Sequence, residues 1–165
     1  MLSREDIDSY FRRRDWRFLK QGDNVWRTGV RDRLPNYQKN FQIFVHLDAD
    51  WVYFQVPLVS DIKQDCSAAL YEFLLQLNYQ AFLAKFCLQG NSVILTSELP
   101  RSCDQDQFND ALWSVDEYAN RYFLEILTMS QDTEIANLWS NRDRQTEDED
   151  SAANESEVPE IILNM

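Results

Sequence analysis

Apolar side chains recur along this chain with two different periods, and these periods predict the order of its helices and strands. Near the start, Ile7 and Phe11 follow helical spacing, and Ser3 with Asp6 resembles a capping box. The arginines that end this stretch suit the negative pole of a helix dipole. The pattern therefore predicts a first helix over residues 4–13.

Alternation with period two follows this helix and predicts four strands. They are expected at residues 16–20, 25–29, 41–47 and 51–56. Turn-forming residues at 21–24 make the first two strands a hairpin, and residues 31–40 are expected to form a loop. Pro57 is expected to end the fourth strand, because proline has no N–H for the strand ladder.

A second helix and a second hairpin are predicted next. Asp65 is expected to cap the helix, which should end near Asn78 after an apolar stripe at helical spacing. Two strands are expected at residues 81–88 and 92–99. Gly90 lies between them in a tight turn, so the two strands should pair as a hairpin.

The clearest periodic signal in the chain predicts a long helix after this hairpin. The helix is expected to begin at Ser102 or Asp104 and to end near Met129, with one or two more turns around Leu138. Its apolar stripe consists of Phe108, Leu112, Val115, Ala119, Tyr122, Phe123, Ile126 and Leu127. One face of this helix should therefore lie against the strands.

The expected order of elements is α-β-β-β-β-α-β-β-α. Strands joined by short turns pair in antiparallel fashion, and helices grouped apart from strands favour the α+β class. We therefore expect a two-layer sandwich of an antiparallel β-sheet with packed helices. Residues 1–140 are expected to form a single domain, and residues 141–165 an acidic, disordered tail with a short apolar end at 158–163.

The net charge of −12 limits the partners that can be expected. A strongly acidic chain repels nucleic-acid phosphates and anionic membrane surfaces, so we expect neither nucleic-acid binding nor membrane insertion. Aromatic and basic residues do mix between Tyr10 and Arg27, as in proteins that stack single-stranded bases. The same mixture is typical of a helix that leads into a half-buried strand, and we favour that interpretation.

Residues that usually carry catalysis or bind metals are few. His46 is the only histidine, and it lies within a predicted strand without a nucleophile motif. Cys66, Cys87 and Cys103 lack metal-ligand spacing and are expected to be reduced thiols in a cytoplasmic protein. Three isolated glycines form no phosphate-binding loop. The sequence therefore indicates no catalytic residue, no metal ligand and no cofactor, and an enzyme is not expected.

Asp48 and Asp50 form the best carboxylate pair, and they lie at a predicted turn between two strands. Two carboxylates two residues apart can bind a hard cation loosely. Aspartates are also favoured in turns for their backbone geometry, which is the simpler interpretation. A small-molecule or metal-ion sensor domain that uses these carboxylates is kept as an alternative function.

The share of aromatic residues, 13%, favours contacts with another protein. Candidate partner-binding residues are Trp16, Phe44, Tyr53 and Trp113, the last of which lies away from the main stripe of the long helix. The expected function is therefore non-catalytic binding of a partner protein of unknown identity, through strand addition or an apolar groove.

Several short phrases in the chain carry a resemblance to a known family. They are Gly22-Asp23-Asn24-Val25-Trp26, Leu47-Asp48-Ala49-Asp50-Trp51-Val52 leading into Val56-Pro57-Leu58, Leu74-Leu75-Gln76-Leu77-Asn78-Tyr79, Ala84-Lys85-Phe86 before Gly90-Asn91, and Glu98-Leu99-Pro100. In this order they resemble the YbjN-like proteins, which share the type III secretion chaperone-like fold. The resemblance covers residues 7–127 and is closest to cyanobacterial members.

This resemblance implies a twisted antiparallel sheet with helices packed against it. Secretion chaperones of this fold form homodimers and hold extended segments of client proteins on their surface, and they hydrolyse nothing and bind no nucleotide. The resemblance therefore implies a chaperone-like homodimer. It transfers no client-binding motif to particular residues, because a shared fold does not determine function.

Overall fold

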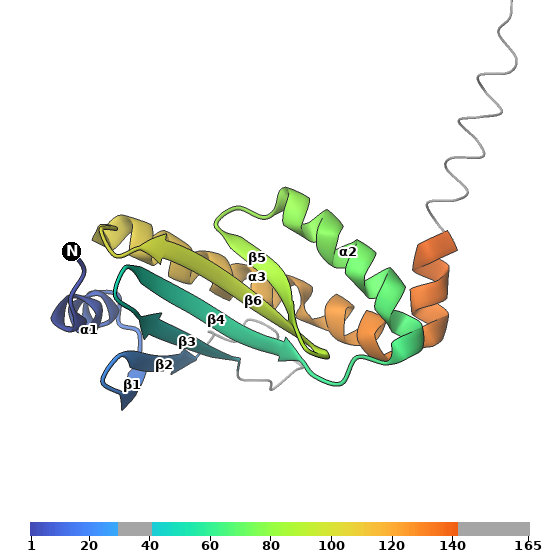
Figure 1. Cartoon of the computed structure of the whole chain (residues 1–165), viewed down its shortest axis with the longest axis horizontal. Coiled ribbons are helices and arrows are strands. Elements are labelled where there is room, and N and C mark those ends of the chain that lie inside the picture. The colour runs from blue at the N-terminus through green and yellow to red at the C-terminus, as the bar shows by residue number, and fades with distance from the viewer. Residues whose placement is uncertain (30–40, 142–165) are drawn as a thin grey trace, which may run out of the picture.

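The segments that show the two hydrophobic periods fold into two layers, a six-stranded sheet and a set of helices (Figure 1). The computed structural model describes residues 1–29 and 41–141, so the loop expected at 31–40 and the tail beyond Asn141 lie outside the described residues. The elements are α1 (Arg4–Arg13), β1 (Phe18–Gly22), β2 (Val25–Gly29), β3 (Gln42–Leu47), β4 (Trp51–Val59), the 3₁₀ helix η1 (Gln64–Cys66), α2 (Ser67–Gln80), β5 (Ala84–Gln89), β6 (Ser92–Pro100) and α3 (Gln105–Gln131). Residues 133–141 are also helical.

The strand order in the sheet is β1-β2-β3-β4-β6-β5, and every neighbouring pair is antiparallel. The chain leaves β4 through η1 and α2, reaches the far edge at β5, and returns with β6 between β4 and β5. The α+β class, the two-layer antiparallel architecture and the order of elements are thus confirmed.

Capping side chains explain where two of the helices begin. The Ser3 hydroxyl accepts from the Asp6 N–H at 3.1 Å and the Asp6 carboxylate accepts from the Ser3 N–H at 2.8 Å, which confirms the capping box of α1. Asp104 and Gln107 form the equivalent box for α3. The long helix therefore begins after Asp104 and not at Ser102.

Pro57 does not end the fourth strand, which continues to Val59. The pairing of β3 with β4 stops at Phe44 and Gln55, so Pro57 lies beyond the last pair on that side. Its missing N–H costs no ladder hydrogen bond there. On its other side Pro57 pairs with Ile94 of β6, next to a register shift. The prediction was wrong because a local signal does not reveal which strand edge is already free.

Asp65 does not cap the second helix. A turn of 3₁₀ helix precedes α2, whose N-cap is Cys66 without a side-chain cap bond, and the Ser67 hydroxyl donates to the Gln64 carbonyl at 2.7 Å. At its other end α2 reaches Gln80, and residues 81–83 turn the chain, so β5 starts three residues later than expected. Residues 81–83, which the apolar pattern assigned to the strand, form the turn that precedes it.

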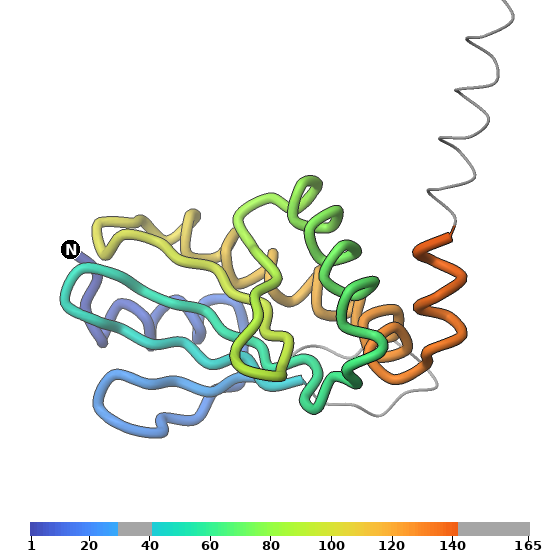
Figure 2. The backbone as a smooth tube through the Cα atoms, turned by 45° about the vertical axis from the view of Figure 1, so that its right-hand side comes forward, coloured from blue at the N-terminus to red at the C-terminus, as the bar shows by residue number. Residues whose placement is uncertain are grey.

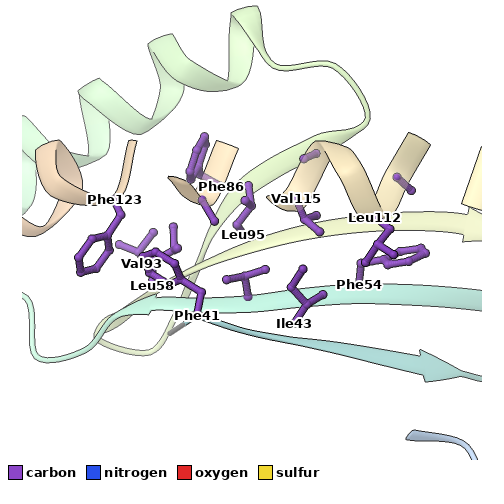
Figure 3. Packing of buried hydrophobic residues seen from close by; sticks show 14 of the residues in the cluster. Phe41, Ile43, Phe54, Leu58, Phe86, Val93, Leu95, Leu112, Val115 and Phe123 are labelled. Carbon is purple, nitrogen blue, oxygen red and sulfur yellow. The ribbon is translucent and has the colours of Figure 1, made fainter. Parts of the chain in front are cut away.

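The core lies between the sheet and α3, which passes behind β4 and β6 in Figure 1. Alternate residues of the strands meet the apolar stripe of α3, as the sequence predicted (Figure 3). The rings of Phe54 and Phe108 lie 5.0 Å apart in edge-to-face geometry, and those of Phe41 and Phe123 lie 4.6 Å apart. One face of the sheet is therefore covered along its length.

Helix α1 is held to the first hairpin by a polar contact as well as by apolar packing. Asp8 accepts a hydrogen bond from the buried Trp26 indole at 2.8 Å and pairs with Lys20 at 2.6 Å. Burial of this carboxyl group raises its pKa, but the bonds from Lys20 and Trp26 outweigh that effect and bring the pKa of Asp8 below its usual value. The folded state therefore stabilises the carboxylate.

This contact predicts a pH dependence of stability. The pKa of Asp8 is lower in the folded state than in the unfolded state. Its carboxylate therefore contributes to the free energy of unfolding above the unfolded pKa, and this contribution is lost as the pH falls through the folded pKa. Asp8→Asn should lower the free energy of unfolding by about 2 kcal/mol at pH 7. On acidification from pH 7 to below about pH 4, the variant should lose less stability than the wild type. Urea unfolding between pH 7 and pH 3 measures both effects. Trp26→Phe removes one donor to the carboxylate and should change the dependence of stability on pH in the same direction, but by less. Identical dependences of stability on pH for wild type and Asp8→Asn would contradict the prediction.

Candidate functional site

The four predicted partner-binding residues lie at two separate places in the fold. Phe44 on β3 and Tyr53 on β4 lie on the face of the sheet opposite to the helices. Trp16, expected in the first strand, precedes β1 and lines a pocket with Trp113 of α3 on the helical side. The structure thus brings the four residues together in two pairs.

No described segment covers the outer face of the sheet. Strand alternation and register place eight residues at its centre, and all but Trp51 are half-buried by their neighbours: Arg27, Phe44, His46, Trp51, Tyr53, Gln55, Ile94 and Thr96. We call this set the open face. The open face has aromatic and aliphatic side chains at positions where the solvent-exposed face of a sheet usually has polar ones. Arg27 is its only residue with a full charge at neutral pH.

Cross-strand pairing arranges the open face as two parallel rows. One row joins Arg27, Phe44, Gln55 and Thr96, and the next joins His46 with Tyr53 and then with Glu98 at the margin. The Phe44 and His46 rings lie 6.4 Å apart along β3. Directly opposed side chains on a sheet are close enough to form one continuous contact surface. The open face can therefore receive a chain laid across the strands.

A shallow hollow marks one end of the open face. It measures about 400 Å³ and is lined by Asn24, Val25, His46, Leu47, Asp48, Tyr53 and Gln55. Burial lowers the pKa of His46, so the imidazole is neutral at physiological pH. The hollow thus combines a neutral imidazole, a phenol and an amide, which are groups that bond to peptide N–H and C=O groups.

The second pair of predicted residues forms a pocket of about 260 Å³ between the end of α1 and the first half of α3. The chain leaves α1 through Asp15 in a left-handed conformation, φ 53°, and the Trp16 N–H then donates to the Phe11 carbonyl at 2.9 Å. This turn directs Trp16 toward α3. The lining residues are Arg14, Trp16, Asn109, Asp110, Leu112 and Trp113, and we call this the tryptophan pocket.

An apolar surface on α2 was not predicted from the sequence. Leu75 and Tyr79 lie one turn apart on α2 and are 70% and 93% exposed, and Leu88 of β5 lines a pocket with Leu75. Phe82, 74% exposed, follows in the turn after the helix. We call these four residues the α2 face. The i, i+4 spacing of Leu75 and Tyr79 is the sequence signal for this surface, whereas Phe82 lies beyond the end of the helix. Trp51 of β4 and Ile94 of β6 on the open face were not predicted either.

Asp48 and Asp50 are placed by the backbone of their turn. The Asp48 carboxylate accepts from the Ala49 N–H at 2.7 Å, and the Arg101 N–H donates to the Asp50 carbonyl at 2.8 Å. The Arg101 guanidinium also donates to the Asp48 and Ala49 carbonyls at 3.3 Å each. Asp48 lines the hollow of the open face and Asp50 does not. The geometry supports the turn interpretation of both aspartates.

Within residues 1–29 and 41–141, no three His, Cys, Asp or Glu side chains gather closely enough to hold a metal ion. None of the described helices is both long and apolar enough to cross a membrane.

Comparison with known proteins identifies the fold. No family model matches the chain, and no curated protein sequence matches it. A chain of the heterodimeric ExoU-SpcU complex from the type III secretion system of Pseudomonas aeruginosa matches with a TM-score of 0.54 at 15% identity, over 73% of this chain and 97% of that chain. YbjN, a proposed transcription regulator from E. coli, matches with a TM-score of 0.51 at 11% identity, over 73% and 90%. At these identities the similarity establishes a shared fold, in agreement with the YbjN-like and secretion chaperone-like fold expected from the sequence.

Proposed function

We propose that this chain is a non-catalytic, chaperone-like protein of the cytoplasm that holds a partner polypeptide on its open face. The observation that carries the proposal is a sheet covered by helices on one face and presenting a half-buried aromatic centre on the other. Aromatic side chains gathered on a surface that no described segment covers are typical of a protein-binding site.

The composition of the open face supports a polypeptide as the ligand. Phe44 and Tyr53 lie diagonally across β3 and β4, with Trp51 further along β4, and aromatic side chains dominate the energetics of protein interfaces. Gln55 and Thr96 lie opposite each other and offer donors and acceptors for a peptide backbone. A protein of the same fold occurs in a heterodimeric complex, which is consistent with this use.

Affinity capture tests the open face directly. Phe44→Thr with Tyr53→Thr keeps residues that favour strands while removing both rings. We expect the double variant to retain its circular dichroism spectrum and to bind the captured protein about 30-fold more weakly than the wild type, from a loss of about 2 kcal/mol. The measurement is affinity purification from native lysate, followed by titration of the purified partner.

Leu138→Ser is the matched control, because Leu138 is 71% exposed on the helix at 133–141, away from the open face. It should bind like the wild type. Equal retention of the partner by the double variant would place the binding surface elsewhere. Reproducible absence of any stoichiometric protein partner with the wild type would count against a binding function.

We further propose that the chain forms a homodimer through the α2 face. In a chain with a net charge of −12, self-association needs a surface with little charge. The 14 residues of α2 include one acidic residue, Glu72, and no basic residue. A helix face of this kind can pack against its own copy around a two-fold axis, because the same patch then serves both subunits. The open face stays accessible in such a dimer.

The alternative function, a small-molecule or ion sensor, would use the hollow beside Asp48. The turn contacts of Asp48 and Asp50 do not favour it, and we rank it below protein binding. A thermal-shift screen against metal ions and metabolites distinguishes the two functions. A specific shift that is lost on Asp48→Ala would promote the sensor.

A further inference from the structure

The charge of this chain is divided unevenly in space as well as along the sequence. Residues 1–29 carry seven Arg or Lys against five Asp or Glu, whereas residues 41–141 carry four against fourteen. The basic excess gathers where α1 ends, at the exposed side chains Arg12, Arg13, Arg14 and Arg17. We call these four residues the basic corner. It is a positive region on an acidic protein.

Parts of the basic corner are not neutralised by the described chain. Arg12 lies 3.9 Å from Asp8, and Arg13 donates to the Gln105 side chain at 2.8 Å. Arg14 and Arg17 form no ion pair with any residue in the described ranges. Arg14 also lines the tryptophan pocket, so unpaired positive charge stands at the edge of a cavity with two indole rings. An acidic segment with an apolar centre fits this combination.

The tryptophan pocket also has an unused hydrogen-bond donor. The Nδ2 group of Asn109 is buried, and it has no hydrogen-bond partner among the described residues. A buried donor without an acceptor is costly, so a bound group that supplies a carbonyl oxygen would be favoured. Beside Asn109 and Arg14, the side chain of Asp110 is the one anionic group that lines the pocket. The ligand should therefore offer acceptors and few donors.

A segment around proline has these properties. Proline contributes a carbonyl and no N–H, and its ring packs on aromatic side chains in grooves that bind extended peptides. The chain holds such a segment at Glu157-Val158-Pro159-Glu160, where two glutamates flank the ring. From Asn141 to Met165 the chain carries two Arg against eight Asp or Glu, so the charge of this region is opposite to that of the basic corner.

The chain is long enough for this segment to reach the pocket. The N-terminal end and the helix at 133–141 lie at opposite ends of the molecule (Figure 2). At 1.5 Å per residue, α3 and the following helix separate Trp113 from Asn141 by at most about 45 Å. The 18 residues from Asn141 to Pro159 span up to about 59 Å when extended. Tethering then gives a high effective concentration without a second molecule.

We propose that the segment around Pro159 binds back to the tryptophan pocket of its own chain, with its ring between the indoles and its glutamates near the basic corner. The pocket is then a docking site for the chain's own acidic tail. This inference does not rest on the open face, which lies on the other side of the sheet. It assigns the tail the role of covering an aromatic, basic surface.

Indole N–H signals in a two-dimensional ¹⁵N NMR spectrum of the full chain test this proposal. The chain has five tryptophans, and single Trp→Phe substitutions assign their signals. In Glu157→Lys with Glu160→Lys, the signals of Trp16 and Trp113 should move, while those of buried Trp26 and of Trp51 on the open face should stay in place. Pro159→Ala should move the same two signals by a smaller amount at unchanged charge.

Salt and charge reversal give independent readouts. Raising NaCl from about 0.02 to 0.5 M shortens the screening length from about 20 to about 4 Å and should move the wild-type signals toward those of the double variant. Adding Arg14→Glu to the double variant should restore at least part of the wild-type positions. Glu147→Lys with Glu149→Lys makes the same charge change ten and eleven residues earlier and is the matched control, which should cause less than about a third of the shift.

Each contrary outcome overturns the proposal in a defined way. Unmoved Trp16 and Trp113 signals in the double variant would show that the segment does not occupy the pocket. An equal shift in the control would show a general charge effect without docking of Pro159. A shift that grows with protein concentration would show that the occupant is the tail of a second copy. A synthetic peptide of residues 153–163 that moves the signals of the wild type further would show that the pocket is empty in the intact chain.

Discussion

Replacing Phe108 by alanine is expected to remove about 3–5 kcal/mol from the free energy of unfolding, the usual cost of a buried Phe→Ala change. Phe108 has no exposed surface, and its ring touches three others, with centroids 5.4 Å from Tyr10, 5.8 Å from Phe11 and 5.0 Å from Phe54. These contacts join α1, α3 and the sheet at one point. The loss is large compared with the total of about 5–15 kcal/mol typical of a folded protein.

Urea unfolding followed by circular dichroism measures this effect. Leu124→Ala is the control on the same helix, since Leu124 is 39% exposed, and it should cost less than about 1 kcal/mol. If both variants lost the same stability, the position of Phe108 at the junction of the layers would have no special energetic weight. Phe108→Leu should recover a large part of the loss, because it refills most of the cavity.

Introducing a glutamate on the α2 face is expected to abolish the proposed homodimer. Leu75→Glu removes an apolar contact and places like charges near each other, and a two-fold interface counts each substitution twice. At about 2 kcal/mol per buried leucine, the dimer should weaken by about 4 kcal/mol, or roughly 1000-fold in Kd. Sedimentation velocity over a range of protein concentrations measures the change.

Leu138→Glu is the matched control for this prediction. It makes the same chemical change at a side chain of similar exposure, 71% against 70%, on a different helix. It should leave the dimer intact, and both variants should keep the wild-type helix content. A wild type that is monomeric at working concentrations would contradict the proposal, and so would dissociation by Leu138→Glu but not by Leu75→Glu.

Local signals predicted the elements well where one physical cause dominates. The helix over Arg4–Arg13 begins at a capping box, whose donors and acceptors lie within four residues of one another. The stripe of α3 needs only a 3.6-residue period and one apolar surface to face. Pro57 and Asp65 were interpreted wrongly because their roles depend on a neighbouring strand edge and on a preceding turn.

The candidate site was less predictable than the fold. Their aromatic character alone indicates four partner-binding residues, Trp16, Phe44, Tyr53 and Trp113, and the structure separates them into two surfaces. An alternating strand pattern says that Phe44 and Phe41 lie on opposite faces, but it does not say which face the helices cover. That choice is made by α3, which packs on one side only.

By itself the sequence determined the order of elements, the antiparallel pairing of hairpins, the apolar stripe of the long helix and the strong acidity of the chain. These features depend on residues near each other in the chain or on composition alone. The tertiary structure decided that β6 inserts between β4 and β5 and that Trp16 and Trp113 line one pocket although 97 positions separate them. It also decided that no segment within residues 1–29 and 41–141 covers the open face. Such features arise from the packing of segments that are distant in the sequence. The free energy gained by burying apolar area depends on the area buried and not on the order of these segments in the chain.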